Sequence, residues 1–201
     1  PILRLLDERS EDARSRSRYE YQLCMKLDDT ARLLGPKVIK TVAFTGSDPF
    51  FRTGTDLAVL FTAENPVVLA GLLAAQHQKA LLTRANVKRE TGTILGTQYT
   101  GVRSPDRRTC SYLCTAGDVV IVTNSISQLE RILATRKGTQ PALATADEFR
   151  FFRDRYPCAA EDETGLLVLS DSAIRRLCSP RWRIAASRRV RAAAVMAELQ
   201  A

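Results

Sequence analysis

The first regular pattern in the chain is an alternation of apolar and polar residues over positions 19–27. Period-two alternation predicts a β-strand with one buried face. A short helix is predicted next, with Asp28 or Asp29 at its N-cap, where a carboxylate accepts hydrogen bonds from free backbone N–H groups. Gly35 and Pro36 should end this helix, so the chain is expected to open with a strand and a short helix.

Two further apolar segments, residues 38–45 and 56–62, are predicted as strands. Residues 46–54 connect them, bounded by Gly46 and Gly54, and are typical of a hairpin loop because glycine adopts the positive φ angles of tight turns. The two strands should therefore pair with each other.

A helix is predicted from Asn65 to about Leu82, because a side-chain cap followed by Pro66 is a strong start signal. Three more strands follow, the last two joined by a turn over residues 116–118. They are predicted at about residues 93–103, 109–115 and 119–123.

Two capping boxes are predicted to open helices, Ser125 with Gln128 and Thr145 with Glu148. In this motif each side chain accepts a hydrogen bond from the other residue's backbone N–H group. A last apolar strand is predicted over residues 165–170.

Asp171 and Ser172 should cap the terminal helices, with a break near Ser179 and Pro180 because proline cannot continue a helix. From Arg181 onward the apolar residues share one helical face, which predicts an amphipathic helix packed on the sheet. These residues are Trp182, Ala186, Val190, Ala193 and Ala197.

The hairpins dominate this order of elements. We therefore predict an α+β fold, a largely antiparallel sheet built of hairpins with helices packed against it. Residues 1–18 are highly charged and are expected to be a linker or an exposed helix. Residues 19–201 are predicted to form a single α+β domain that ends in the arginine-rich amphipathic helix.

The chain has 201 residues and a formal net charge of +8, with 30 Lys or Arg against 22 Asp or Glu. A basic surface can attract nucleic acid or anionic lipid, although a bias toward arginine also follows from a GC-rich genome. Much of the excess follows Ser172, in Arg175, Arg176, Arg181, Arg183, Arg188, Arg189 and Arg191. No apolar run approaches the roughly 18 residues of a membrane span, and the start at Pro1 leads us to expect a longer protein upstream.

The five cysteines fit neither a disulfide framework nor a common zinc pattern. Cys110 and Cys114 lie four residues apart on a predicted strand, on the same face but separated along it. Most of the five cysteines are predicted to be small buried apolar residues.

His77 is the only histidine, and Gln76, Gln78 and Lys79 beside it predict a solvated helix face. The residues from Arg103 to Arg108 are predicted to form a solvated turn. The glycine-rich phosphate loop, the dinucleotide fingerprint and the GxSxG elbow are all absent. No catalytic, cofactor-binding or metal-binding residue is therefore predicted, and no cofactor.

The candidate contact residues lie at two places. In the loop 46–54, two adjacent aromatic residues either fold back on the core or form a contact patch, and Asp48 shapes the turn. In the terminal helix, arginines lie off the apolar face. The candidates are Asp48, Phe50, Phe51, Arg52, Arg188 and Arg191.

Two segments carry a resemblance to a protein family. The first is the run from Thr55 to Phe61 followed by Asn65 and Pro66, and the second runs from Gly117 to Ser125 and on to Phe149. Over about residues 38–172 this order resembles an uncharacterised family of bacterial, often membrane-anchored, extracytoplasmic proteins. The resemblance implies a location at the cell envelope and a binding or scaffolding role, and it implies no catalytic residues.

The leading hypothesis is a non-catalytic interaction or scaffold module of a larger bacterial protein, whose partner is another protein or another part of the same chain. One alternative is a nucleic-acid or polyanion-binding module that uses the C-terminal arginines. A second alternative is a hydrolase that uses two of the carboxylates of Asp48, Asp56 and Asp171 in one pocket.

Overall fold

The computed structural model describes residues 14–25, 38–47, 54–157, 168, 171, 174 and 180–200. The contacts along the chain divide it into two units, residues 1–140 and 141–201, and each unit is described by itself. The single domain expected over residues 19–201 stays a prediction.

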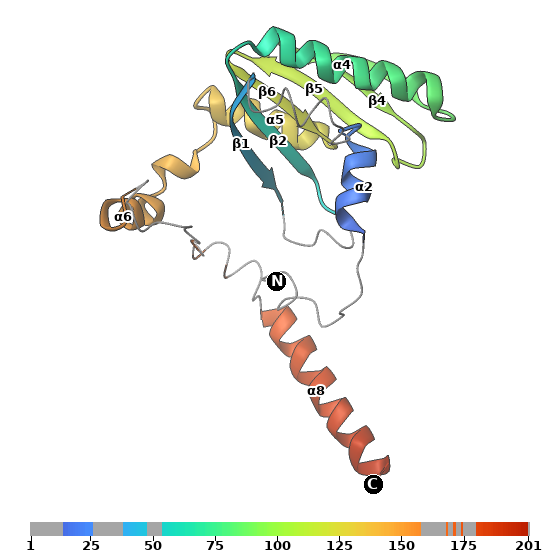
Figure 1. Ribbon diagram of the computed structural model, residues 1–201. Coiled ribbons are helices and arrows are strands. Elements are labelled where there is room, and N and C mark those ends of the chain that lie inside the picture. The colour runs from blue at the N-terminus through green and yellow to red at the C-terminus, as the bar shows by residue number, and fades with distance from the viewer. Residues whose placement is uncertain are drawn as a thin grey trace. The chain divides into compact units, whose positions relative to one another are not determined.

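Six strands form one sheet in the first unit, and every neighbouring pair is antiparallel (Figure 1). The order across the sheet is β1-β2-β6-β5-β4-β3, so the hairpin β1–β2 joins the run β3 to β6 through the pair β2–β6. The α+β prediction is confirmed. The strands are β1 (Ile39–Gly46), β2 (Leu57–Ala63), β3 (Lys88–Ile94), β4 (Thr97–Arg103), β5 (Cys110–Ala116) and β6 (Val119–Thr123).

Helices cover both faces of this sheet. Among the described residues of the first unit, the helices are α2 (Ser15–Gln22), α4 (Pro66–Thr83) and α5 (Ile126–Arg136). Helix α4 packs chiefly on β5, β4 and β6, while α5 packs on β6 and β2 from the opposite face (Figure 1). Each face of the sheet therefore has its own core, because successive side chains of a strand point to opposite faces.

The two cores divide the residues of β5 between them. Leu113 packs with Leu69 of α4 in the first core, and Cys114 packs with Leu129 of α5 in the second. The central strand β6 is buried on both faces, with Ile121 only 1% exposed. Two-sided burial explains why β6 is an unbroken apolar run rather than an alternating one.

The predicted strand over residues 19–27 is wrong, because residues 15–22 form the helix α2. Its buried residues Tyr19 and Leu23 are four positions apart, a spacing that fits a strand face and a helix face equally well. The ion pair between Arg16 and Glu20, with Nε and Oε1 2.7 Å apart, also spans one helical turn.

The single strand predicted over residues 93–103 is also wrong, because a turn divides this region into β3 and β4. Leu95 and Gly96 form that turn with φ angles of 48° and 78°. Two consecutive positive φ angles make the tight turn whose twist suits a two-residue hairpin. The strand β3, which begins at Lys88, was not predicted.

The N-caps of α4 and α5 are confirmed. Asn65 accepts a hydrogen bond from Val68 N, and Ser125 accepts one from Gln128 N. The reciprocal half of the predicted capping box is absent, because the Ser125 N–H donates to Thr123 Oγ1 at 3.2 Å. The Gln128 amide donates to Thr45 Oγ1. This bond ties α5 to β1.

The second unit contains a 3-10 turn, η1 (Leu143–Thr145), and the helices α6 (Asp147–Arg155) and α8 (Pro180–Gln200). The capping box predicted for Thr145 and Glu148 is wrong, since Ala146 is the N-cap and no side chain caps α6. Thr145 Oγ1 donates to Ala142 O within η1. The helix predicted to follow Asp28 and the strand predicted over residues 165–170 lie outside the described residues.

Candidate functional site

Four of the six predicted contact residues, Asp48, Phe50, Phe51 and Arg52, lie outside the described residues. The described base of their loop is held by Asp56. Its Oδ1 accepts from Ser47 N at 2.6 Å, and its Oδ2 accepts from Ser47 Oγ at 2.6 Å. Both oxygens of this carboxylate therefore close the β1–β2 hairpin.

Asp171 lies in the second unit, where its backbone N–H donates to the Glu148 carboxylate at 3.2 Å. Asp56 lies in the first unit, which is described separately. The hydrolase alternative, which needs two such carboxylates in one pocket, stays a prediction.

The expectation that His77 lies on a solvated helix face is wrong, because this side chain is only 6% exposed. Its Nε2 lies 2.8 Å from Ser111 Oγ on β5, and Ser111 in turn donates to the backbone carbonyl of Leu23, also at 2.8 Å. Burial first, and then the positive charges of Arg84 and Arg89, lower the pKa of His77 from 6.5 to about 4.

These bonds define the state of the imidazole. Because Ser111 uses its single proton toward Leu23 O, its oxygen accepts from His77, and His77 is neutral with the proton on Nε2. A nucleophilic serine needs the opposite arrangement, in which the histidine accepts the hydroxyl proton. The pair therefore joins α4, β5 and the end of α2 as a structural relay.

The signal that could have placed His77 is the spacing of α4. Leu69, Leu73 and His77 follow one another at intervals of four, which puts the histidine on the helix face that packs on the sheet. The prediction of a solvated position instead followed the polar residues next to His77 in the sequence.

Arg84, just beyond α4, fastens the C-terminal end of α2. Its Nη1 donates to Tyr21 O at 2.7 Å and to Thr109 Oγ1 at 2.9 Å, and it lies 3.3 Å from Cys24 Sγ. The guanidinium also lies 3.8 Å from the centroid of the Tyr21 ring, a favourable cation–π distance. This arginine is therefore occupied by the protein itself.

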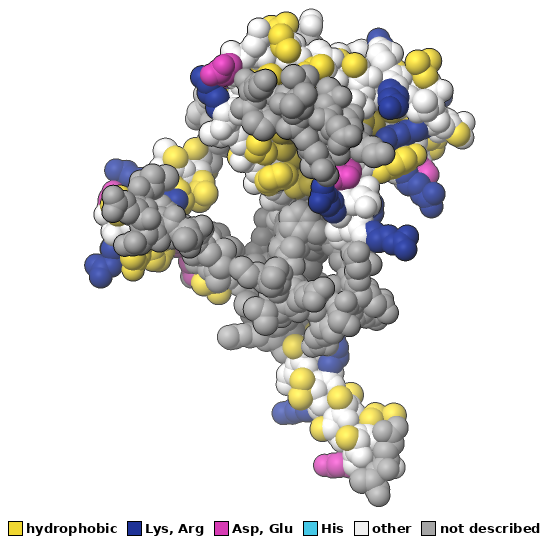
Figure 2. Space-filling view, viewed as in Figure 1, with side chains coloured by type: hydrophobic (Ala, Val, Ile, Leu, Met, Phe, Trp, Pro, Cys, Tyr) yellow, Lys and Arg dark blue, Asp and Glu magenta, His cyan; other side chains and the backbone are white. Residues whose placement is uncertain are grey.

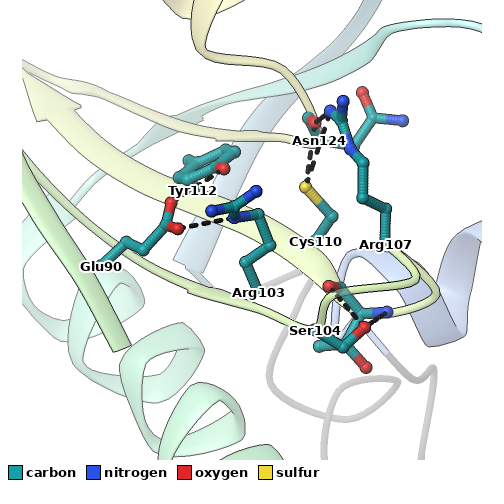
Figure 3. A network of polar contacts seen from close by, with 8 residues as sticks. Glu90, Arg103, Ser104, Arg107, Cys110, Tyr112 and Asn124 are labelled. Atoms are coloured by element: carbon teal, nitrogen blue, oxygen red, sulfur yellow. Dashed lines mark hydrogen bonds and ion pairs between the residues drawn. The ribbon is translucent and has the colours of Figure 1, made fainter. Parts of the chain in front are cut away.

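Asn124, at the end of β6, is a buried junction that is 6% exposed (Figure 3). Its Oδ1 accepts from Leu57 N at 2.8 Å, and its Nδ2 donates to Thr55 O and to Gln22 Oε1, both at 3.0 Å. Its backbone carbonyl accepts from the Arg107 guanidinium at 3.3 Å. These bonds join α2, β2, β6 and the β4–β5 turn.

The turn from Arg103 to Arg108 is largely exposed, as predicted, and two of its arginines also make internal contacts. Arg103 Nε pairs with Glu90 Oε1 at 2.5 Å, and Tyr112 donates to Glu90 Oε2 at 3.0 Å (Figure 3). Arg107 is held by Asn124. The Arg108 side chain is 84% exposed, so this turn combines a solvated surface with internal bonds from Arg103 and Arg107.

The outward surface of α4 is apolar over residues 66–75 and again at Leu82, with the exposed polar residues Gln78 and Lys79 between them. We call it the α4 face and define it by Val67, Val68, Leu72 and Leu82, which are 76%, 48%, 43% and 85% exposed. Gly71 and Ala75, both exposed, lie among them. Figure 2 shows hydrophobic side chains at the surface over α4. An amphipathic helix would place polar residues here.

Arg188 and Arg191 lie on α8, and both side chains are exposed. Exposed apolar residues share that helix, including Val190 and Leu199 at 69% and 77%. The side chain of Trp182, which was expected to anchor this helix, lies outside the described residues.

No protein family, curated protein or solved structure matches this chain. Within the part of the chain that the structure describes, no cluster of three His, Cys, Asp or Glu residues could hold a metal ion. Within the same part, no helix combines the length and the apolar character that crossing a membrane requires. Cys24, Cys110 and Cys114 are buried, in line with the prediction that most of the cysteines are small buried residues.

Proposed function

We propose that this chain is a non-catalytic interaction module of a larger bacterial protein, and that the α4 face is its contact surface. The observation that carries the proposal is that α4 is apolar all round over residues 66–75, before the exposed Gln78 and Lys79. Leu69 and Ala80 are buried against the sheet, while Val68 and Leu72 face outward. A helix that is apolar all round is normally covered on all sides.

The chemistry of the described residues supports the same proposal. The polar groups that could have been reactive are engaged in internal bonds: His77 with Ser111, Asp56 with Ser47, and Asn124 with three elements. Burial raises the pKa of the Cys24 and Cys114 thiols, which disfavours the reactive thiolate. The occupant of the α4 face is then another protein or another part of the longer chain.

Site-specific photocrosslinking tests this proposal. A photoreactive amino acid at Leu72 in the complete protein, in its native cells, should give one discrete adduct. The same residue at Thr91, an exposed polar position on β3, should give none. With the photoreactive residue kept at Leu72, exchanging Val67 and Val68 for Ser should abolish the adduct without lowering the melting temperature. Equal crosslinking at Leu72 and Thr91 would contradict the proposal.

The location at the bacterial cell envelope belongs to this proposal and rests on the family resemblance over residues 38–172. Fractionation of cells that produce the complete protein tests it. Recovery of the protein in the cytosolic fraction would count against the envelope.

Polyanion binding is a second candidate, favoured by the exposure of Arg188, Arg189 and Arg191 within four residues of α8. Phosphate or sulfate groups bound by arginines release counterions, so the affinity should fall steeply with salt. Retention on heparin at low salt, lost when Arg188 and Arg191 are exchanged for Gln, would support it.

A further inference from the structure

The strand β1 forms one edge of the sheet and differs from the opposite edge in character. Among the described residues β1 pairs only with β2, and β3 pairs only with β4. Strand β3 begins with Lys88, Arg89 and Glu90, and such charges discourage another strand from pairing with an edge. Strand β1 carries no charge from Thr41 to Gly46.

Two of the exposed residues of β1 are large and apolar. Val42 is 46% exposed and Phe44 is 71% exposed. They pair with Phe61 and Val59 of β2, so they lie on the face of the sheet that holds the first core. The main contacts of α4 and α5 are with strands other than β1. The apolar side chains on this face of the sheet therefore continue as far as β1 at its edge.

The pattern of β1 is symmetric about Ala43. Val42 and Phe44 flank it, and Thr41 and Thr45 follow on either side. Antiparallel pairing of two copies about Ala43 would place Val42 opposite Phe44 of the other copy and Thr41 opposite Thr45. Aromatic with β-branched pairs and threonine pairs are both favourable across antiparallel strands.

The same register agrees with the neighbouring residues. In this register one row of apolar side chains would run from Val59 and Phe44 of the first copy to Val42 and Phe61 of the second copy. These side chains would cover one another. Lys40, which pairs with Glu64 at 3.8 Å, would lie opposite Gly46 rather than opposite its own copy. Like charges therefore do not meet at this edge.

We propose that β1 is a self-association edge, through which two copies of this chain pair antiparallel about Ala43 and join their sheets into one. The partner is a second copy because the residue pattern is complementary to itself. This inference goes beyond the interaction function proposed for the α4 face and uses a different surface. One strand pair buries little area, which makes the dimer reversible and dependent on concentration.

Introducing a positive or a negative charge at Ala43 tests both the pairing and its register. Ala43 is exposed, so Lys or Glu there should leave the fold intact. Sedimentation of the 201-residue chain should show a monomer–dimer equilibrium. Ala43→Lys alone should weaken it about tenfold or more, because two ammonium groups would lie directly opposite. Ala43→Glu alone should do the same.

An equimolar mixture of Ala43→Lys and Ala43→Glu should restore the dimer, which a merely disruptive substitution could not do. Thr91→Lys, on the opposite edge strand, is the matched control and should leave association unchanged. A monomer at every concentration, or a mixture that fails to associate, would overturn the proposal. In that event a discrete adduct at Leu72 would still support the interaction function, and its absence would remove that as well.

Discussion

His77 on α4 and Ser111 on β5 share a buried hydrogen bond, with Nε2 and Oγ 2.8 Å apart. The Ser111 hydroxyl donates in turn to Leu23 O, so a short chain of hydrogen bonds connects α4, the sheet and the end of α2. A polar group in this position is stabilising only while its partners are present, since an unsatisfied buried donor or acceptor is costly.

Replacing His77 with Ala is therefore expected to lower the free energy of unfolding by about 2–3 kcal/mol, through the cavity and the lost hydrogen bond. Urea denaturation of the 201-residue chain measures the change. Gln78→Ala, at the exposed neighbouring position, should stay within about 0.5 kcal/mol. Equal urea midpoints for the parent and His77→Ala would show that the relay contributes nothing.

The depressed pKa of His77 predicts a dependence of stability on pH. The folded state holds this pKa at about 4 against 6.5 for a free histidine, so the unfolded chain binds the proton more readily. Stability should fall as the pH drops from 6.5 toward 4, by about 2 kcal/mol between roughly pH 7 and pH 5. His77 contributes no pH dependence above this window.

The measurement compares urea midpoints of the parent and His77→Gln at the two pH values. Because the chain has a single histidine, the variant should lose most of the pH dependence in this range. An equal change of the urea midpoint between the two pH values in both proteins would assign the effect to other titratable groups.

Two glycines should respond to alanine in opposite directions. A Cβ at Gly101 on β4 would lie 2.6 Å from Tyr112 Cδ1 and 2.7 Å from Ser111 O, so Gly101→Ala should cost about 1–3 kcal/mol through overpacking. At Gly71, in α4, no atom lies within 4 Å of the added carbon. Gly71→Ala should therefore stabilise the helix by about 0.5–1 kcal/mol. Thermal melting of both variants checks the contrast.

Exchanging Arg188 and Arg191 for Gln should change stability by less than about 1 kcal/mol, because exposed charges contribute little. If the interaction function on the α4 face is the correct one, heparin retention of this double variant should fall only modestly, in line with two lost charges. Loss of all retention at low salt would favour the polyanion alternative.

Trp182→Ala tests separately whether this side chain anchors α8. A loss of about 3–5 kcal/mol in the free energy of unfolding is expected if the tryptophan is buried.

The local signals in the sequence predicted several elements well. Asn65 with Pro66 started α4, and Ser125 started α5, because caps act within a few residues of their position. Local signals failed where a strand and a helix place the same pair of residues on one face. Tyr19 and Leu23 fit a strand or a helix equally, and contact of α2 with the sheet decided in favour of the helix.

Most of the candidate contact residues could be named from the sequence but not assigned a role. Arg188 and Arg191 are exposed as expected, and the four loop candidates lie outside the described residues. The α4 face and the β1 edge were not predicted, because the same apolar residues in a helix or a strand suit burial as well as exposure. Only the position of the sheet shows which of them face outward.

By itself the sequence determined the α+β class, most strand positions and the starts of α4 and α5, since these follow from periodicity and from backbone hydrogen bonds within a few residues. The tertiary structure alone decided that His77 is buried against Ser111, that Asn124 joins four segments, and that β1 is left at an edge. Each depends on residues far apart in the chain meeting across the sheet, and strand order is not encoded in any local pattern.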